Sequence, residues 1–420
     1  MATHTWPSWA DHAIWWHVMP LSATGAPGTL DEDAPLLHRL GRVEGWLDHL
    51  VSLGCSGLQL GPVFRSTSHG YDTLDHRHVD PRLGDDEDLD HLVAACHARG
   101  VRVMLDGVFN HVSRDHPLFR RAEADGPHSE AASFFDFRRA QDGKWYPQVF
   151  EGNADLVTLN HRSPAVADLV VDVMCRWCAR GVDAWRLDAA YAVDPAFWAE
   201  VLPRVRESFP EVLVVGEVIH GDYPALVEAA TLDSLTQYEL WKAIWSSVES
   251  QNLFELDWSL QRHDAFLDTF VPTTFVSNHD TTRIASRIGT AGAEVAATVL
   301  MGVGGMPVVY HGDEFAMTGV KEDRPGGDDA VRPELPADLQ PLAADPAAAH
   351  MLHVHRSLIA LRRRHPWLVR ARAHQRALTN THAVWEVVGE GGEVLVLEVD
   401  LSDTPWALIR GGTVLFDTRW

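Results

Sequence analysis

Two carboxylic acids end short apolar stretches of the sequence, Asp188 in AWRLDA (184–189) and Glu217 in LVVGEV (213–218). If these stretches are neighbouring parallel strands, about 5 Å apart, their terminal carboxylates can approach to about 5–5.5 Å. Two acids at that separation can cleave an acetal, because one protonates the departing oxygen while the other attacks the anomeric carbon. One acid must then stay protonated near neutral pH, which burial beside a like charge achieves. The pair therefore indicates a retaining glycosidase.

Other polar side chains are expected around this pair. Arg186 precedes Asp188 by two residues, so both side chains project from the same face of a strand, and the cation would keep the carboxylate ionised as a nucleophile. Tyr71, in the loop motif HGYDT, is expected to be exposed and to offer an aromatic face to a sugar ring. Further donors and acceptors for sugar hydroxyls are Asp106 and His111 in DGVFNH, and His279 and Asp280 in SNHD.

These residues require a fold that brings many strand ends together. Residues 10 to about 365 alternate short apolar stretches with longer amphipathic ones, which is typical of parallel strands joined by crossover helices. The candidate strands are residues 13–20, 57–63, 102–109, 184–189, 213–218, 232–237, 273–278 and 306–312. Catalytic groups collect at the carboxyl ends of barrel strands. We therefore predict an α/β fold, a (β/α)8 TIM barrel formed by residues 1–111 and 161–366.

Segments outside this alternation predict the remaining organisation. Residues 112–160 lack clear periodicity and are expected to form a small inserted subdomain after the third strand. Residues 320–346 are rich in Pro, Gly and Asp and predict a long loop after the eighth strand. Residues 348–365 predict an amphipathic helix. Alternation in period two around Gly-Gly turns then predicts a C-terminal antiparallel β domain over residues 367–420.

Four motifs, DGVFNH, GVDAWRLDA, GEV and SNHD, resemble in order and spacing the signature regions of the α-amylase family, glycoside hydrolase family 13. Residues 50–89 and 98–111 are similar in particular to neopullulanases, cyclomaltodextrinases and maltogenic amylases. The resemblance covers about residues 10–365. It implies that Asp188 is the nucleophile, Glu217 the general acid/base and Asp280 a third carboxylate that holds sugar hydroxyls.

The resemblance also implies a sugar-binding set and a substrate class. The set comprises Tyr71, Asp106, His111, Arg186 and His279, with His69 beside Tyr71, and Asp328 and Arg332 of GGDDAVR as an Asp-x3-Arg pair. The implied reaction is hydrolysis of α-1,4 or α-1,6 bonds in malto-oligosaccharides, cyclodextrins or related short α-glucans. One alternative is transfer to a second sugar, because the same covalent intermediate serves both reactions. The other is a non-catalytic carbohydrate-binding relative.

The sequence departs from the family pattern in three places. It begins at the first barrel strand, without the N-terminal domain that supports dimers in the neopullulanase-like group, so we expect a monomer. Residues 190–192 are Ala-Tyr-Ala where many α-amylases have a Lys-His pair that contributes to a calcium site. Only Asn110 keeps a calcium position, so no cofactor is expected to be required, and a structural calcium ion stays an open alternative. DLVTLN (155–160) matches neither linkage-associated motif, which leaves the linkage preference open.

The amino-acid composition limits the classes of binding partner that the protein can have. The net charge of −24 argues against nucleic acid and anionic membrane surfaces as partners. The partner that the resemblance implies is an oligosaccharide substrate. No apolar stretch of about 20 residues and no signal peptide is evident, and the four cysteines suit a reducing cytoplasm. Cys175 and Cys178 form a single CxxC, which we interpret as helix packing. His76 and His78 form an HxH in a predicted loop, where a zinc site is disfavoured.

Overall fold

The computed structural model describes residues 6–31, 33–324 and 326–420. Each of the eight predicted strands is present within its predicted range. They are β1 (Trp15–Val18), β2 (Gly57–Leu60), β5 (Arg102–Gly107), β10 (Ala184–Leu187), β11 (Leu213–Gly216), β12 (Ser234–Leu235), β13 (Thr273–Thr274) and β14 (Met306–Tyr310). All are paired in parallel, in the order β12-β11-β10-β5-β2-β1-β14-β13. The predicted (β/α)8 barrel is confirmed.

The barrel closes between its two shortest strands. A parallel bridge pairs Thr236 with Thr273 and so joins β12 to β13. Side chains reinforce this junction, because the hydroxyl of Ser234 lies 2.8 Å from that of Thr273 and 2.7 Å from the carbonyl oxygen of Val271. The closed sheet has its strand ends at a common mouth, which is the condition for the predicted residues to meet.

Alternate residues of each strand face the inside and the outside of the barrel. Trp15 packs in the interior with Met104 and Leu213, whereas its neighbour Trp16 belongs to the larger core beneath the helices. Trp15 faces Gly57 across the sheet, where an added Cβ would lie 2.3 Å from the indole ring. Only glycine at position 57 leaves room for this tryptophan, so Gly57 allows Trp15 to fill the interior of the barrel.

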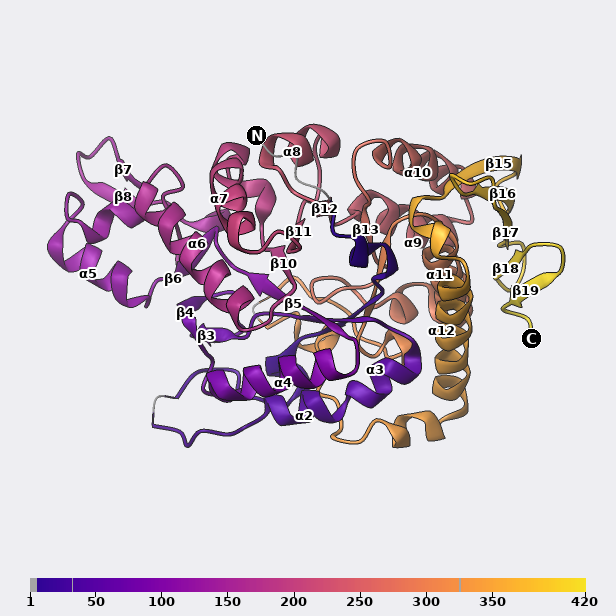
Figure 1. Ribbon diagram of the computed structural model, residues 1–420, viewed down its shortest axis with the longest axis horizontal. Coiled ribbons are helices and arrows are strands. Elements are labelled where there is room, and N and C mark those ends of the chain that lie inside the picture. Colours follow the sequence, from indigo (N-terminus) through magenta and orange to yellow (C-terminus); the bar gives the residue numbers. More distant parts are fainter. Residues whose placement is uncertain (1–5, 32, 325) are drawn as a thin grey trace.

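Helices surround the barrel, as Figure 1 shows. They are α2 (Leu40–Gly45), α3 (Leu47–Leu53), α4 (Asp86–Ala98), α6 (Pro164–Ala179), α7 (Pro195–Ser208), α8 (Tyr223–Ala230), α9 (Tyr238–Ser250), α10 (Leu253–Phe266), α11 (Ile284–Gly302) and α12 (Pro346–Arg364). The helix predicted at residues 348–365 is therefore confirmed as α12. Cys175 and Cys178 are free thiols in α6, and Cys178 accepts a hydrogen bond from Trp185 Nε1 over 3.4 Å, which confirms a packing role.

The HxH motif is not in a loop, and that prediction is wrong. His76 and His78 lie in strand β4 (Thr73–Val79), which pairs antiparallel with β3 (Phe64–Ser66). The imidazole of His76 is buried with Nε2 2.8 Å from the carbonyl oxygen of Val108, whereas His78 is exposed beside Asp75. The two side chains serve different neighbours and do not share a metal position.

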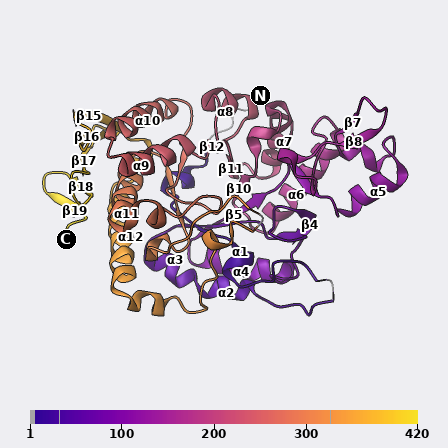
Figure 2. The same ribbon diagram turned by 180° about the vertical axis from the view of Figure 1, so that it is seen from behind.

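Residues 112–160 contain more regular structure than their sequence pattern suggests. Strand β6 (His111–Ser113) pairs with β9 (Leu156–Thr158), and between them lie α5 (Pro117–Asp125) and the hairpin of β7 (Phe137–Arg139) and β8 (Trp145–Pro147). A short turn, η3 (Phe150–Gly152), returns the chain toward the barrel. The hairpin and α5 form one end of the molecule in both views (Figures 1 and 2).

The opposite end of the molecule is a five-stranded antiparallel sheet (Figure 2). Its strands are β15 (Arg372–Leu378), β16 (His382–Val388), β17 (Val394–Asp400), β18 (Trp406–Arg410) and β19 (Val414–Asp417). Trp385 is buried against α10 and donates a hydrogen bond to Asp257 Oδ1 over 2.8 Å. The predicted C-terminal β domain is confirmed. Among the described residues, no helix is both long and apolar enough to cross a membrane.

Candidate active site

Arg186 lies at the centre of the residues predicted to be catalytic. It faces Asp106 across the β5–β10 pair, and its Nη1 lies 2.8 Å from Oδ1 of that residue. Nη1 also contacts Asp188 Oδ1 at 3.1 Å, and Nη2 contacts Glu217 Oε1 at 2.6 Å. All four side chains are buried. One guanidinium therefore bridges both acids of the predicted pair and fixes their relative position.

The backbone between the two acids also positions them. Ala189 follows Asp188 with φ 46° and ψ 37°, a left-handed conformation that is uncommon outside glycine. This conformation directs its N–H toward Glu217 Oε2, to which it donates over 2.9 Å. Both oxygens of Glu217 thus have donors, which holds the carboxyl group in a single orientation.

Two residues that the sequence did not indicate complete the support of Glu217. The hydroxyl of Tyr238 donates to Glu217 Oε1 over 3.1 Å, and Asn278 Nδ2 donates to that hydroxyl over 2.8 Å. Tyr238 lies three residues after β12, the sixth barrel strand, and Asn278 lies within the SNHD motif. The rule that strand ends carry functional groups could have identified both.

The site contains more buried carboxyl groups than cations. Burial raises the pKa of Asp188 well above its usual range; Arg186 opposes this effect, and Glu217 and Asp106 add to it. Burial likewise raises the pKa of Asp106, against the opposing charge of Arg186. The contact with Arg186 therefore does not offset the effect of burial on the pKa of Asp188, contrary to the expectation that this cation keeps the carboxylate ionised.

Asp280 differs from these acids because a histidine and an arginine contact it. Its Oδ2 lies 3.0 Å from His279 Nε2, and its Oδ1 lies 2.8 Å from Arg332 Nη2. Burial acts to raise the pKa of Asp280, but His279 and Arg332 outweigh it and hold the pKa well below its usual range. Arg332 Nη2 also contacts Asp328 at 3.0 Å, so the predicted Asp-x3-Arg pair lies at this acid.

Tyr71 is buried, at 8% exposure, and the expectation of an exposed ring is wrong. Its hydroxyl donates to Asp106 Oδ2 over 2.9 Å and lies 2.5 Å from His279 Nε2. The ring stacks on His279 with centroids 5.2 Å apart, which covers one of its faces. His69 is exposed, and its Nδ1 accepts from the Tyr71 backbone N–H over 3.2 Å. Tyr71 therefore joins the Asp106 and Asp280 sides of the site.

His111 is buried and its ring nitrogens contact protein atoms. Nε2 lies 3.1 Å from the carbonyl oxygen of Tyr71, and Nδ1 lies 3.1 Å from Asn110 Nδ2. Its ring stacks on Phe150 of η3 with centroids 4.5 Å apart. Burial lowers the pKa of His111 to about 4, so the imidazole is neutral at pH 7. This histidine links the barrel mouth to the inserted segment.

Asn110 is the calcium position that the sequence keeps, and calcium takes six to eight oxygen ligands. A pocket of about 470 Å³ beside Asn110 is also lined by Asp136, Arg138 and Arg162. Both arginines pair with Asp136, at 3.2 and 3.0 Å. The carboxylate of Asp136 is therefore already paired with two guanidinium groups.

A further cluster of potential ligands has a structural explanation. Among the described residues, only His38, Asp85 and Asp88 bring three metal-binding side chains together. Asp85 and Asp88 form the capping box of α4, and His38 Nδ1 lies 2.6 Å from Asp88. These contacts account for the cluster as a helix cap.

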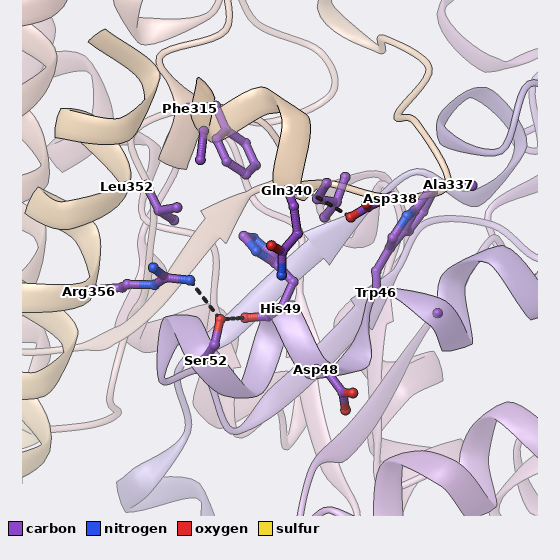
Figure 3. A pocket seen from close by; sticks show the side chains of 13 residues that line it. Trp46, Asp48, His49, Ser52, Phe315, Ala337, Asp338, Gln340, Leu352 and Arg356 are labelled. Carbon is purple, nitrogen blue, oxygen red and sulfur yellow. Dashed lines mark hydrogen bonds between the residues drawn. The ribbon is translucent and has the colours of Figure 1, made fainter. Parts of the chain in front are cut away.

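The pocket in Figure 3 is separate from the residues predicted to be catalytic. It has a volume of about 590 Å³ and lies between α3 and α12. Ser52 donates to the carbonyl oxygen of His49 over 2.9 Å and accepts from Arg356 over 2.9 Å, so these polar groups bind one another (Figure 3). None of the predicted catalytic or sugar-binding residues lines this pocket.

Comparison with known proteins shows to which protein family this chain belongs. Residues 40–381 match the model of the alpha amylase catalytic domain. The chain therefore belongs to the alpha-amylase family, which confirms the predicted family.

Particular relatives refine this likeness. The chain is 30% identical over 339 residues to a cyclomaltodextrinase of Geobacillus thermopakistaniensis, covering 74% of this chain and 57% of that protein. It is 29% identical over 345 residues to a maltogenic alpha-amylase of Bacillus acidopullulyticus, covering 74% and 58%. The chain thus spans less than two thirds of the length of these relatives. In fold it resembles the cyclic alpha-maltosyl-(1→6)-maltose hydrolase of Arthrobacter globiformis, with TM-score 0.81, 23% identity and coverage of 94% and 92%.

Proposed function

We propose that the protein is a retaining α-glycoside hydrolase that acts on malto-oligosaccharides, cyclodextrins or related short α-glucans. The observation that carries this proposal is the contact of one buried guanidinium, that of Arg186, with both Asp188 and Glu217. The similarity to a cyclomaltodextrinase and a maltogenic alpha-amylase supports the substrate class.

In the proposed first step, an Asp188 carboxylate oxygen forms a bond to the anomeric carbon. The bond from that carbon to the leaving oxygen breaks, and Glu217 transfers its proton to this oxygen. In the second step, Glu217 removes a proton from water, the water oxygen bonds to the anomeric carbon, and the ester bond to Asp188 breaks. Two inversions retain the α configuration.

The other residues of the site are proposed to bind the sugar whose bond is cleaved. Asp280 is held ionised by His279 and Arg332, so it can accept hydrogen bonds from two sugar hydroxyls and stabilise a developing positive charge. Asp106 positions Arg186 and Tyr71. Sugar contacts are also proposed for Tyr71, His69, His111, His279, Asp328 and Arg332.

The inserted segment is proposed to cover one side of the cleft. The stack of Phe150 on His111 supports this role, because it attaches η3 to the barrel mouth. We propose the limits 1–111 and 161–366 for the barrel, 112–160 for the inserted subdomain and 367–420 for the C-terminal domain.

The test uses Glu217→Gln, with Glu228→Gln on the exposed face of α8 as a matched control. Products from maltotriose, isomaltose, cyclodextrin, pullulan and sucrose are separated by chromatography, and the anomer of the first product is identified by NMR. We expect wild type and Glu228→Gln to release the α anomer, and Glu217→Gln to lose about 10²–10⁴-fold in rate on sugar substrates. Unchanged turnover by Glu217→Gln would refute the assignment, a β anomer would refute retention, and longer saccharides among the products would show transfer.

A further inference from the structure

Two buried ring nitrogens inside the barrel have no hydrogen-bond partner among the described residues. They are Nε2 of His17, in β1, and Nδ1 of His279, in the SNHD motif. The two rings meet edge to face with their centroids 5.4 Å apart, and the residues are only 3% and 1% exposed. A buried polar atom without a partner costs free energy, so two such atoms on neighbouring rings indicate a shared ligand.

A small cavity lies beside both histidines. Its volume is about 30 Å³, and its lining includes His17, His279 and Gln59. Gln59 faces His17 across the β1–β2 pair, and its amide can both donate and accept hydrogen bonds. A polar cavity of this size can hold one water molecule, and a buried water typically makes about three hydrogen bonds. The volume and the lining therefore suit a water molecule and exclude a sugar.

The other neighbours of the two rings constrain where their hydrogens lie. Nε2 of His279 is 3.0 Å from Asp280 Oδ2, and an ionised carboxylate only accepts, so this nitrogen carries a hydrogen. In the neutral ring, Nδ1 of His279 is then an acceptor. Burial lowers the pKa of His17 well below its usual value, and the neighbouring His279 and Arg186 add to this effect. His17 is therefore a neutral imidazole with one donor and one acceptor nitrogen.

We propose that one buried water molecule joins Nε2 of His17 to Nδ1 of His279, and that His17 is thereby a positioning residue for His279. The water donates a hydrogen to Nδ1, which keeps the hydrogen of the His279 ring on Nε2, directed at Asp280. Without this contact the ring can carry its hydrogen on Nδ1 instead, and it then presents a lone pair to the carboxylate. The inference rests on the proposed function, in which Asp280 binds the sugar.

The test has a structural part and a kinetic part. Crystal structures of wild type and His17→Phe show whether an ordered water lies within hydrogen-bond distance of Nδ1 of His279. The values of kcat and KM for maltotriose, and the thermal unfolding midpoint, are measured for wild type, His17→Phe and His17→Gln. Phenylalanine keeps a ring at position 17 without a nitrogen, whereas glutamine keeps a donor and an acceptor without the ring.

The matched control is His355→Phe. His355 is a buried histidine of α12 that does not line the cavity. It reports what the same substitution does to activity when it is made at a buried position elsewhere in the protein.

We expect the wild-type crystals to contain the water, and His17→Phe to lose it. The value of kcat for maltotriose should fall about tenfold in His17→Phe, the effect of weakening one hydrogen bond to a charged group. It should stay within about threefold of wild type in His17→Gln and be unchanged in His355→Phe. If His17 served only to pack against neighbouring rings, the order would be reversed, because phenylalanine preserves that packing better than glutamine.

Wild-type crystals without this water would overturn the inference. So would a His17→Phe variant with wild-type kcat, or a His17→Gln variant that is less active than His17→Phe. Each of these results leaves the proposed function intact. A wild-type protein that cleaves no α-glucan would refute the proposed function, and the crystal structures would then decide separately whether the water joins the two histidines.

Discussion

The hydroxyl of Tyr238 donates a hydrogen bond to Glu217 Oε1 over 3.1 Å. Tyr238→Phe removes this donor and also leaves Asn278 Nδ2 without its acceptor, while the ring still fills the same space. We expect kcat/KM for maltotriose to fall about tenfold, because one hydrogen bond to a carboxylate is lost. Steady-state kinetics measures the effect.

Tyr223→Phe is the matched control for Tyr238→Phe. The Tyr223 ring is buried and its hydroxyl donates to the carbonyl oxygen of Ile219 over 3.1 Å, after the same strand that carries Glu217. This variant should retain wild-type kcat/KM within about twofold. Equal losses in the two variants would show that any buried tyrosine hydroxyl in this region matters, and not the contact with Glu217.

Arg186→Met should destabilise the protein because it leaves buried carboxylates without their cation. Removing one partner of a buried ion pair typically costs about 3–5 kcal/mol. Arg204→Met is the control, since Arg204 pairs with Asp168 at 2.7 Å on the surface, and loss of such a pair costs less than about 1 kcal/mol. Urea unfolding gives both free energies. Similar values for the two variants would contradict the central structural role of Arg186.

The left-handed conformation of Ala189 makes a specific prediction. Ala189→Gly relieves the backbone strain but adds entropy to the unfolded chain, so the free energy of unfolding should change by less than about 1 kcal/mol and activity should be retained. Ala189→Val should cost more than about 1 kcal/mol, because a β-branched residue is strained in this conformation. Thermal unfolding and kinetics of both variants check this. A stable, active valine variant would show that the conformation is not needed to direct the N–H toward Glu217.

Buried histidines should make the protein less stable in mild acid. His263 is fully buried in α10 with Nε2 3.1 Å from the carbonyl oxygen of Gly304, and burial lowers its pKa to about 4. Between the unfolded pKa of about 6.5 and this value the unfolded chain binds more protons, so stability falls as the pH falls through that range. At pH 5 the loss from this histidine is about 2 kcal/mol.

His263→Leu tests this dependence. Urea unfolding at pH 7 and pH 5 should show a smaller loss of stability in the variant than in wild type, by about 2 kcal/mol, although the variant is less stable at both values. His91→Gln, at an exposed position of α4, should keep the wild-type dependence. An unchanged dependence in His263→Leu would mean that this histidine is already charged in the folded protein.

The barrel was predictable because most of its strands combine an apolar stretch with a polar end, a pattern confined to a few neighbouring residues. Asp188 and Glu217 were identified for the same reason: they end adjacent strands. Their contacts with a single guanidinium follow from strand register, since Arg186 faces Asp106 on one side and Val215 on the other.

Other features depend on contacts between distant segments, which no local pattern contains. Tyr71 was expected to be exposed, but it is buried because His279, from the far side of the barrel, stacks on it. The bond from Tyr191 to Glu151 joins a strand end to an aperiodic segment. The partners of Tyr238 likewise depend on the closure of the sheet between the sixth and seventh strands.

That closure has a consequence for the order in which the molecule opens. The junction of β12 and β13 has one bridge between two-residue strands, whereas β5 and β10 share a register of four residue pairs. Local opening costs least where backbone hydrogen bonds are few. We expect deuterium to enter the amides at the Thr236–Thr273 junction before those of β5 and β10. Because Tyr238 and Asn278 follow these two short strands, the same opening would release the groups that hold Glu217. Local opening of the barrel would thus be linked to the residue that we propose as the general acid.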